Sequence, residues 1–142
     1  MKKLTVIIIS FLFLQMDCMA LYGEEYLVVC HKESPVDTLT SQQVQRIFLG
    51  KMKKWSDGSS IEIVVNSNKE VHAQFSRNVL NKSPSQLSNY WRKMLFSGKS
   101  MMPVLVKNDM DAKSYVAKHS NALTYIAITS FDPILKKIIV IE

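Results

Sequence analysis

The chain is 142 residues long, 47% hydrophobic and 21% charged, and carries a formal net charge of +6. A chain of this length forms one compact domain, and this one has no internal repeat, no low-complexity segment and no second long apolar run. The positive charge favours anionic partners. However, apart from two lysines at the start of the chain and short groups at 51–54 and 136–137, the lysines are scattered, so the sequence lacks the basic stripe of a nucleic-acid-binding protein.

The beginning of the chain has the features of a secretory signal peptide. Two lysines stand at its start, and residues 6–14 are apolar except for one serine. This run is shorter than the roughly 20 residues that a transmembrane helix needs. We therefore predict a signal peptide at residues 1–20, with cleavage after Ala20 and with Gly23 as the alternative site.

Residues 21–142 are expected to form a single exported domain, periplasmic or secreted. Lipidation through Cys18 is disfavoured because Asp17 occupies a place where the processing signal needs a small residue. After cleavage only Cys30 remains, so no intramolecular disulfide can form. A lone thiol within an apolar run is typical of a small buried hydrophobe.

The first half of this domain alternates strands with helices. Residues 26–30 form a continuous apolar run that is typical of a buried strand. Thr40 and Gln43 have the spacing of a capping box that opens a helix, and Gly50 ends that helix. Residues 61–65 are rich in β-branched side chains and predict the next strand.

Two further helices are predicted after this strand. Ser67 and Glu70 repeat the capping-box spacing at the start of the first. Ser83, followed by a proline at the first helical position, caps the second, which ends at Gly98. Five apolar residues of the second helix form its expected buried stripe: Leu87, Tyr90, Trp91, Met94 and Leu95.

The last third of the chain predicts strands at 103–106 and 123–128, with a helix between them that begins at Asn108 or Asp109. A final strand is predicted at 137–141. Strands that alternate with helices, and apolar runs unbroken by polar residues, are typical of a sheet covered on both faces. We therefore expect an α/β fold, a three-layer sandwich with a mostly parallel sheet.

Several segments resemble one protein family. Residues 40–65 read TSQQVQRIFLGKMKKWSDGSSIEIVV, in which the helix exit Ile-Phe-x-Gly-Lys is followed by Trp55 and a turn. This order resembles the phosphate-type periplasmic substrate-binding proteins of ABC transporters. Segments 91–98 and 121–126 resemble later parts of the same family. The resemblance implies the fold of one lobe of a type 2 periplasmic binding protein, since members of that family have two lobes.

Two loops are candidates for a binding site. In an open α/β sheet, ligands bind beyond the carboxyl ends of the strands, where helices begin. One such loop follows the strand at 26–30, and the other follows the strand at 61–65. In the second loop, backbone N–H groups and the positive end of a helix dipole attract anions. The predicted residues of a small-anion site are Ser34, Asn66, Ser67, Asn68 and Lys69.

A structural interpretation of the second loop competes with this prediction. Ser67 and Glu70 would form a helix cap that needs no ligand, and the Glu70 carboxylate would repel a bound anion. The family carries an arginine at this strand end and Ser-Gly-Thr at the helix start. This chain has Asn66 there, followed by Asn68-Lys69-Glu70. The resemblance therefore does not imply specificity for phosphate.

Two functions are expected from these features. The first is an exported solute-binding module that recognises a small oxyanion, such as phosphate, without covalent chemistry. The alternative is an interaction or sensory accessory protein that keeps the lobe fold and binds a protein partner, such as a membrane transporter or sensor component. Self-association of the lobe is open under either function.

Nothing in the sequence indicates an enzyme or a metal site. His31, His72 and His119 are scattered without the spacing of metal ligands. Ser34 and Ser67 have no evident His and Asp partners that would activate a nucleophile. We expect no catalytic residue, no cofactor, no metal and no nucleic-acid partner.

Overall fold

The computed structural model describes residues 25–99 and 102–142. The predicted signal peptide at residues 1–20 lies outside this part of the chain, so its prediction stands untested. Within the described part, the predicted strands and helices occur in the predicted order, and two short strands, Thr38–Thr40 and Leu135–Lys137, are additional to them. No described helix has the length and apolar character that crossing a bilayer requires.

The main sheet has five strands in the order β4-β3-β5-β1-β6. β3 (Glu62–Asn66), β4 (Val104–Val106) and β5 (Ala122–Ala127) run in the same direction. β1 (Tyr26–His31) is antiparallel to both of its neighbours, β5 and β6 (Leu135–Lys137). The sheet is therefore mostly parallel, as predicted, but its first strand in the sequence runs against the others.

A second, two-stranded sheet pairs β2 (Thr38–Thr40) in parallel with β7 (Ile139–Ile141). The prediction of one strand at 137–141 is therefore wrong. Ile138 divides it, because its N–H donates to the Val28 carbonyl at 2.9 Å and its side chain is buried. The chain thus passes from the main sheet into the small sheet at this residue.

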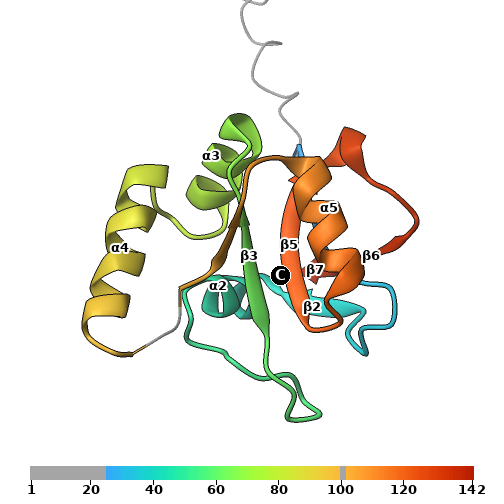
Figure 1. Cartoon of the computed structure of the whole chain (residues 1–142), viewed down its shortest axis with the longest axis horizontal. Coiled ribbons are helices and arrows are strands. Elements are labelled where there is room, and N and C mark those ends of the chain that lie inside the picture. Colours follow the sequence, from blue (N-terminus) through green and yellow to red (C-terminus); the bar gives the residue numbers. More distant parts are fainter. Residues whose placement is uncertain (1–24, 100–101) are drawn as a thin grey trace, which may run out of the picture.

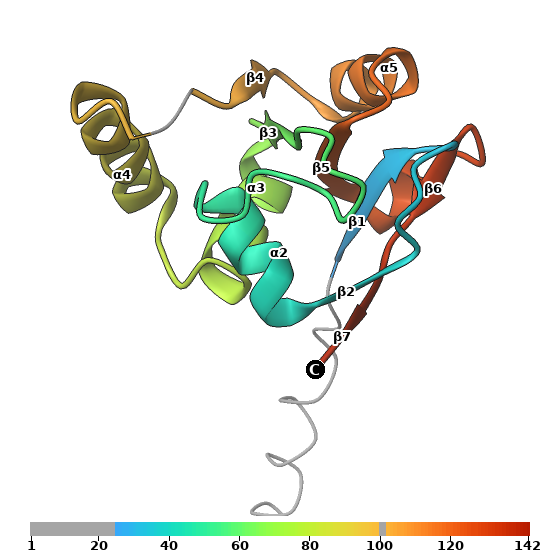
Figure 2. The same cartoon turned by 90° about the horizontal axis from the view of Figure 1, so that it is seen from below.

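The helices lie on both faces of the main sheet (Figure 1). α2 (Ser41–Phe48), α3 (Lys69–Asn78) and α4 (Pro84–Phe96) lie on one side, and α5 (Asp109–Lys118) covers the other, as the turned view shows (Figure 2). A single turn of 3-10 helix, η1 (Ile128–Ser130), follows β5. The predicted three-layer α/β sandwich is confirmed.

Each face of the sheet has its own core. Val28 and Cys30 of β1 pack with the residues of α2, α3 and α4, whereas Val29 between them packs with Ala112 and Val116 of α5. This alternation follows from the period of two in a strand. Burial on both faces also explains why the strands read as continuous apolar runs.

Two helix starts follow the sequence closely. The Thr40 hydroxyl accepts from the Gln43 N–H at 3.1 Å, and the Gln43 side chain accepts from the Thr40 N–H at 2.8 Å. Ser83 and Gln86 form the same pair of bonds at the start of α4. Both predicted caps are confirmed, and each satisfies N–H groups that the helix itself leaves unpaired.

The predicted capping box at Ser67 and Glu70 is wrong. α3 begins later, its N-cap is Asn68, and no side chain caps it. The Ser67 N–H donates to the Val106 carbonyl at 2.9 Å, which keeps Ser67 in line with β3 alongside β4. The chain therefore turns into the helix only after Ser67.

The predicted stripe of α4 is only partly buried. Leu87 and Trp91 are buried, and Tyr90 and Met94 pack against the same core, but Leu95 is 46% exposed. The reason is the position of α4, which packs against α3 and lies beside the sheet rather than across it (Figure 1). A helix in this position buries a narrower face, so the prediction for Leu95 is wrong.

Candidate functional site

The carboxyl ends of β3, β4 and β5 meet at one edge of the main sheet, because these strands are parallel. α3 and α5 begin at this same edge (Figure 1). We call it the carboxyl edge and define it by residues 66–70, 106–109 and 127–128. It contains four of the five residues predicted for the anion site: Asn66, Ser67, Asn68 and Lys69.

Asn66 is fully buried at the end of β3, and both polar atoms of its side chain are engaged. Its Nδ2 donates to the Asp109 carboxylate at 2.6 Å and to the Tyr125 carbonyl at 3.0 Å. Its Oδ1 accepts from the Asn68 N–H at 3.0 Å. Asn66 therefore positions the surrounding groups and has no hydrogen left to offer to a ligand.

Ser67 and Lys69 face solvent beside it, and Asn68 is half-buried. The Asn68 side chain lies with its Nδ2 3.4 Å from Asp109 Oδ1. Neither the Ser67 hydroxyl nor the Lys69 ammonium has a hydrogen-bond partner among residues 25–99 and 102–142. These two groups are therefore available to a solute.

The start of α3 is open as well. Since no side chain caps it, the N–H groups of Lys69, Glu70 and Val71 have no acceptor within the described part of the chain. Such groups, together with the positive end of the helix dipole, form a favourable place for negative charge. The Glu70 carboxylate in the same turn is negatively charged and repels anions.

Asp109 is the residue of this edge that the sequence prediction did not include in the site. It is the first residue of α5, 8% exposed, and its carboxylate accepts the bonds from Asn66 and Asn68 as well as one from the Ala127 N–H at 3.1 Å. The only available signal was its place after the strand predicted at 103–106, where a carboxyl edge was expected. The sequence predicted it solely as a possible helix cap, and that cap is Asn108.

A second polar contact lies beneath the start of α3. His72 Nδ1 is 2.6 Å from the Tyr125 hydroxyl, which is also 3.3 Å from the Asn66 carbonyl oxygen. Burial lowers the pKa of His72 and raises the pKa of Tyr125. Both side chains are therefore uncharged near neutral pH, so they position β5 against α3 without adding charge to the edge.

Ser34, the fifth predicted residue, lies elsewhere. Because β1 is antiparallel to β5, the carboxyl end of β1 is at the opposite edge of the sheet. Ser34 is buried there, its hydroxyl 3.4 Å from the Val36 N–H and its carbonyl accepting from Lys136 Nζ at 2.6 Å. Burial raises the pKa of the neighbouring Cys30 thiol. Ser34 therefore does not share a site with Asn66 to Lys69.

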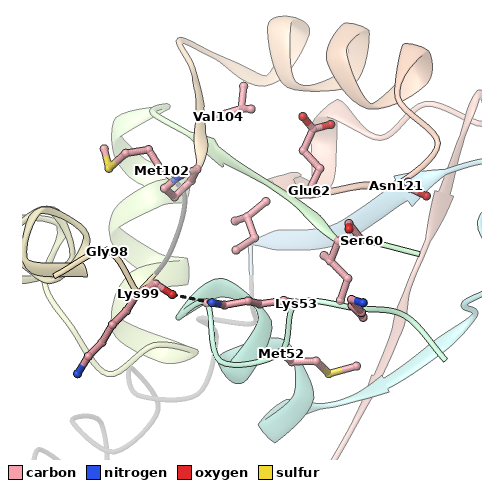
Figure 3. A pocket seen from close by; sticks show the side chains of 14 residues that line it. Met52, Lys53, Ser60, Glu62, Gly98, Lys99, Met102, Val104 and Asn121 are labelled. Carbon is pink, nitrogen blue, oxygen red and sulfur yellow. Dashed lines mark hydrogen bonds between the residues drawn. The ribbon is translucent and has the colours of Figure 1, made fainter. Parts of the chain in front are cut away.

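A depression of about 810 Å³ also lies at that opposite edge (Figure 3). Two of the polar side chains that line it, Lys53 and Glu62, form hydrogen bonds. Lys53 Nζ donates to the Lys99 carbonyl at 2.6 Å, and the Glu62 carboxylate accepts from the Tyr115 hydroxyl at 2.7 Å. The bond to Glu62 raises the pKa of Tyr115 to about 12. None of the predicted site residues lines this depression.

The carboxyl edge combines hydrogen-bond donors with a buried acidic side chain. It offers a hydroxyl, an ammonium and three backbone N–H groups around the start of α3, and one buried carboxylate beside them. The structurally described residues contain no cluster of three or more His, Cys, Asp or Glu side chains that would hold a metal ion.

Comparisons with known proteins agree at the level of fold. No protein-family model and no curated protein sequence matches the chain. Solved structures do match, among them a protein from Clostridium perfringens described as a phosphate ABC transporter substrate-binding protein, with bound phosphate. It is 19% identical, with a TM-score of 0.65. The match covers 82% of this chain and 44% of that one.

Two further structures give the same result. An ABC-type phosphate transport receptor from Vibrio cholerae is 18% identical, with a TM-score of 0.62 over 82% of this chain and 46% of its own. A phosphate binding protein from Stenotrophomonas maltophilia is 12% identical, with a TM-score of 0.56 over 82% and 39%. The chain therefore has the fold of a single lobe of a periplasmic binding protein and spans less than half the length of these structures.

Proposed function

We propose that the protein is an exported solute-binding module that recognises a small oxyanion, such as phosphate, without covalent chemistry. The site of recognition is the start of α3. One observation carries the proposal: at the carboxyl edge, the uncapped N–H groups of α3 lie next to the Ser67 hydroxyl and the Lys69 ammonium, which have no partner among the described residues. Charge and hydrogen-bond donors thus converge on one point.

The fold supports this proposal. Structures that share the lobe include proteins described as binding or transporting phosphate, one of them with phosphate bound. The carboxyl edge is also where open α/β sheets hold their ligands. These structures are less than 20% identical to the chain, so the choice of phosphate as the anion is itself part of the proposal.

The expected affinity is low. Small-molecule sites bury most of the surface of their ligand, and a single lobe provides one wall. The donors around Ser67 and Lys69 are exposed, so salt screens them and water competes with them. We expect a Kd for phosphate of about 1 mM or weaker at low ionic strength, equivalent to about −4 kcal/mol.

An NMR titration of the isotopically labelled protein, produced from residue 21, tests this proposal. Phosphate and sulfate are added at low ionic strength, and backbone amide shifts are followed. The amides of Ser67, Lys69 and Glu70 should shift together and saturate in the millimolar range. Addition of sodium chloride should reverse the shifts, because exposed charges are screened.

A pair of lysine variants provides the control. Lys69→Gln should weaken phosphate binding about two- to fivefold, since an exposed charge contributes up to about 1 kcal/mol. Lys118→Gln removes the same charge from the last turn of α5, at the opposite edge of the sheet, and should leave binding unchanged. Equal effects of the two variants, or no shifts at millimolar phosphate, would contradict the site.

Export belongs to the same proposal. If residues 1–20 are a signal peptide cleaved after Ala20, the protein recovered from the periplasm or culture medium has a mature mass that begins at Leu21. Intact-mass measurement distinguishes this end from one that follows Gly23. Recovery of the full-length chain from the cytoplasm alone would contradict export.

A second candidate function is an interaction or sensory accessory module that binds a membrane transporter or sensor component. The observation in its favour is the buried Asp109 carboxylate, which takes up the donors of Asn66 and Asn68 at the edge where a solute would bind. The chain also spans less than half of the binding proteins that share its fold.

Cross-linking in intact cells, followed by purification of the protein, separates these functions. The second candidate predicts one membrane component recovered in a fixed ratio, whether or not phosphate is present. Recovery of the protein without any stoichiometric partner would exclude it, and the phosphate titration would then decide on the first. Sedimentation of the purified protein reports self-association in the same experiment series.

A further inference from the structure

We propose that the Asp109 carboxylate is an internal anionic ligand of the carboxyl edge: it occupies the inner hydrogen-bond donors and keeps multiply charged oxyanions away from them. This inference deepens the proposed function, on which it rests, by naming the residue that limits the charge of an acceptable solute. It is carried by the burial and the hydrogen bonds of one side chain.

The carboxylate is held entirely by neutral N–H groups. Asp109 is 8% exposed, and it forms no ion pair with any lysine, arginine or histidine of the described part of the chain. Its Oδ1 is 2.6 Å from Asn66 Nδ2 and 3.4 Å from Asn68 Nδ2. Its Oδ2 accepts from the Ala127 N–H at 3.1 Å. A buried charge without a counter-ion requires such compensation.

The Asp109 carboxylate also lies near the N-terminal ends of two helices. Asp109 is the first residue of α5, and Asn68, within reach of its carboxylate, is the N-cap of α3. The positive ends of both helix dipoles therefore act on the same carboxylate. Amide donors and helix starts that converge on a negative group are the environment in which proteins bind free anions.

An oxyanion at this point would meet two obstacles. One hydrogen of the Asn66 amide is directed to Asp109 and the other to the Tyr125 carbonyl, so none is free. A solute at the start of α3 would also lie close to the carboxylate, and like charges at such distances repel strongly. What remains for a solute is the outer set of donors at Ser67 and Lys69.

A purely structural role for Asp109 predicts something different. In that case its carboxylate only ties β3, β5 and α5 together, and its removal lowers stability without creating affinity for anions. If the carboxylate is an internal ligand, its removal leaves a vacated anion site. Small external anions should then enter the site and restore stability.

Thermal denaturation of the protein produced from residue 21 tests this difference. The variants are Asp109→Ala, which makes room, and Asp109→Asn, which keeps the shape without the charge. The control is Asp111→Ala, which removes the same charge from an exposed position in the same turn of α5. Each is titrated with acetate, phosphate and sulfate, with sodium chloride added so that ionic strength stays constant.

We expect Asp109→Ala to have a lower Tm than the wild type and to regain part of that loss as acetate or phosphate is added. Wild type and Asp111→Ala should gain less, because both keep the Asp109 carboxylate and bind phosphate only weakly at the outer donors. By NMR titration, Asp109→Asn should bind phosphate at least about tenfold more tightly than the wild type, because the repulsive charge is gone. If Asp109→Ala does not fold, this second measurement alone decides.

The outcomes separate this inference from the proposed function. If the Asp109 variants gain no more affinity or anion-dependent stability than Asp111→Ala, the inference is overturned, whatever the wild type binds. If the wild type binds no phosphate while Asp109→Asn does, the inference holds and the proposed function fails. Binding by both, with the tenfold gain in Asp109→Asn, supports the two together.

Discussion

Asn66 connects four elements through one buried amide. It lies at the end of β3 and bonds to Asp109 of α5, to the Tyr125 carbonyl of β5 and to the N–H of Asn68 at the start of α3. A buried amide with every bond satisfied fixes its neighbours in one arrangement, whereas a lost partner leaves the others unpaired. Asn66 was predicted to contact a ligand. In the structure its side chain bonds to β5, α3 and α5 and holds them together at the carboxyl edge.

The variant Asn66→Leu is expected to destabilise the protein by about 2–4 kcal/mol, because it leaves the buried Asp109 carboxylate short of its nearest donor. Urea denaturation followed by circular dichroism measures this change. Asn68→Ala is the matched control, since its longer and half-exposed bond to Asp109 should contribute less than about 1 kcal/mol. Similar losses in the two variants would contradict the role assigned to Asn66.

His72 makes the free energy of unfolding depend on pH. Burial lowers its pKa from the ordinary value of 6.5, so the unfolded chain binds a proton more readily than the folded protein. The free energy of unfolding therefore falls as the pH falls through 6.5 towards the lower pKa of the folded state. Urea denaturation at a series of pH values between 8 and 5 should show this loss.

The variant His72→Gln isolates the contribution of the histidine. It removes the titrating group while keeping a polar side chain near the Tyr125 hydroxyl. The difference in stability between wild type and variant should be constant above pH 7 and should shift in favour of the variant below 6. Parallel pH profiles for the two proteins would show that His72 contributes no such dependence.

At the scale of elements, α2 and α4 begin with complete capping boxes whereas α3 begins with none. A side-chain cap supplies an acceptor for N–H groups that would otherwise depend on water. The exception coincides with the edge where solute binding is proposed. The uncapped N–H groups of α3 and the side chains of Ser67 and Lys69 are thus hydrogen-bond donors at the same edge that have no acceptor among the described residues.

Three alanine variants test this difference. Thr40→Ala and Ser83→Ala should each lower the free energy of unfolding by about 1 kcal/mol, as is usual for the loss of an N-cap side chain. Ser67→Ala should change it by less than about 0.5 kcal/mol, because its hydroxyl caps nothing. A loss at Ser67 comparable to the other two would show that it caps α3 in solution.

At the scale of the whole molecule, one lobe has a core on each face of its sheet. The aromatic rings of Phe48, Phe75 and Tyr125 pack together on one of these faces, with the centroids of Phe75 and Tyr125 3.9 Å apart. Cores of this kind make a domain of this size able to fold without a second lobe.

We therefore expect the protein produced from residue 21 to unfold cooperatively in a single transition. Trp55 and Trp91 are both buried on the side of α2, α3 and α4, so their fluorescence reports the tertiary core. Their transition in urea should coincide with the loss of helical circular dichroism. Separate midpoints for the two signals would indicate that part of the lobe needs a partner to fold.

Much of the architecture could be predicted from the sequence. The strand at 26–30, the helix starts at Thr40 and Ser83 and the mostly parallel sheet all agree with the structure. These features depend on patterns within a few residues: apolar runs and capping spacings. The cap expected at Ser67 had the correct spacing but failed, because a bond to the Val106 carbonyl holds that residue in the extended conformation.

The sequence by itself determined the order of most elements, the caps of α2 and α4 and the concentration of polar residues after β3, because each of these depends on side chains close together in the chain. Only the tertiary structure decided that β1 runs against the other strands, which places Ser34 at the far edge. It also brought Asp109 within 2.6 Å of Asn66, 43 positions earlier. Strand direction and such contacts follow from the packing of distant segments, which local periodicity does not encode.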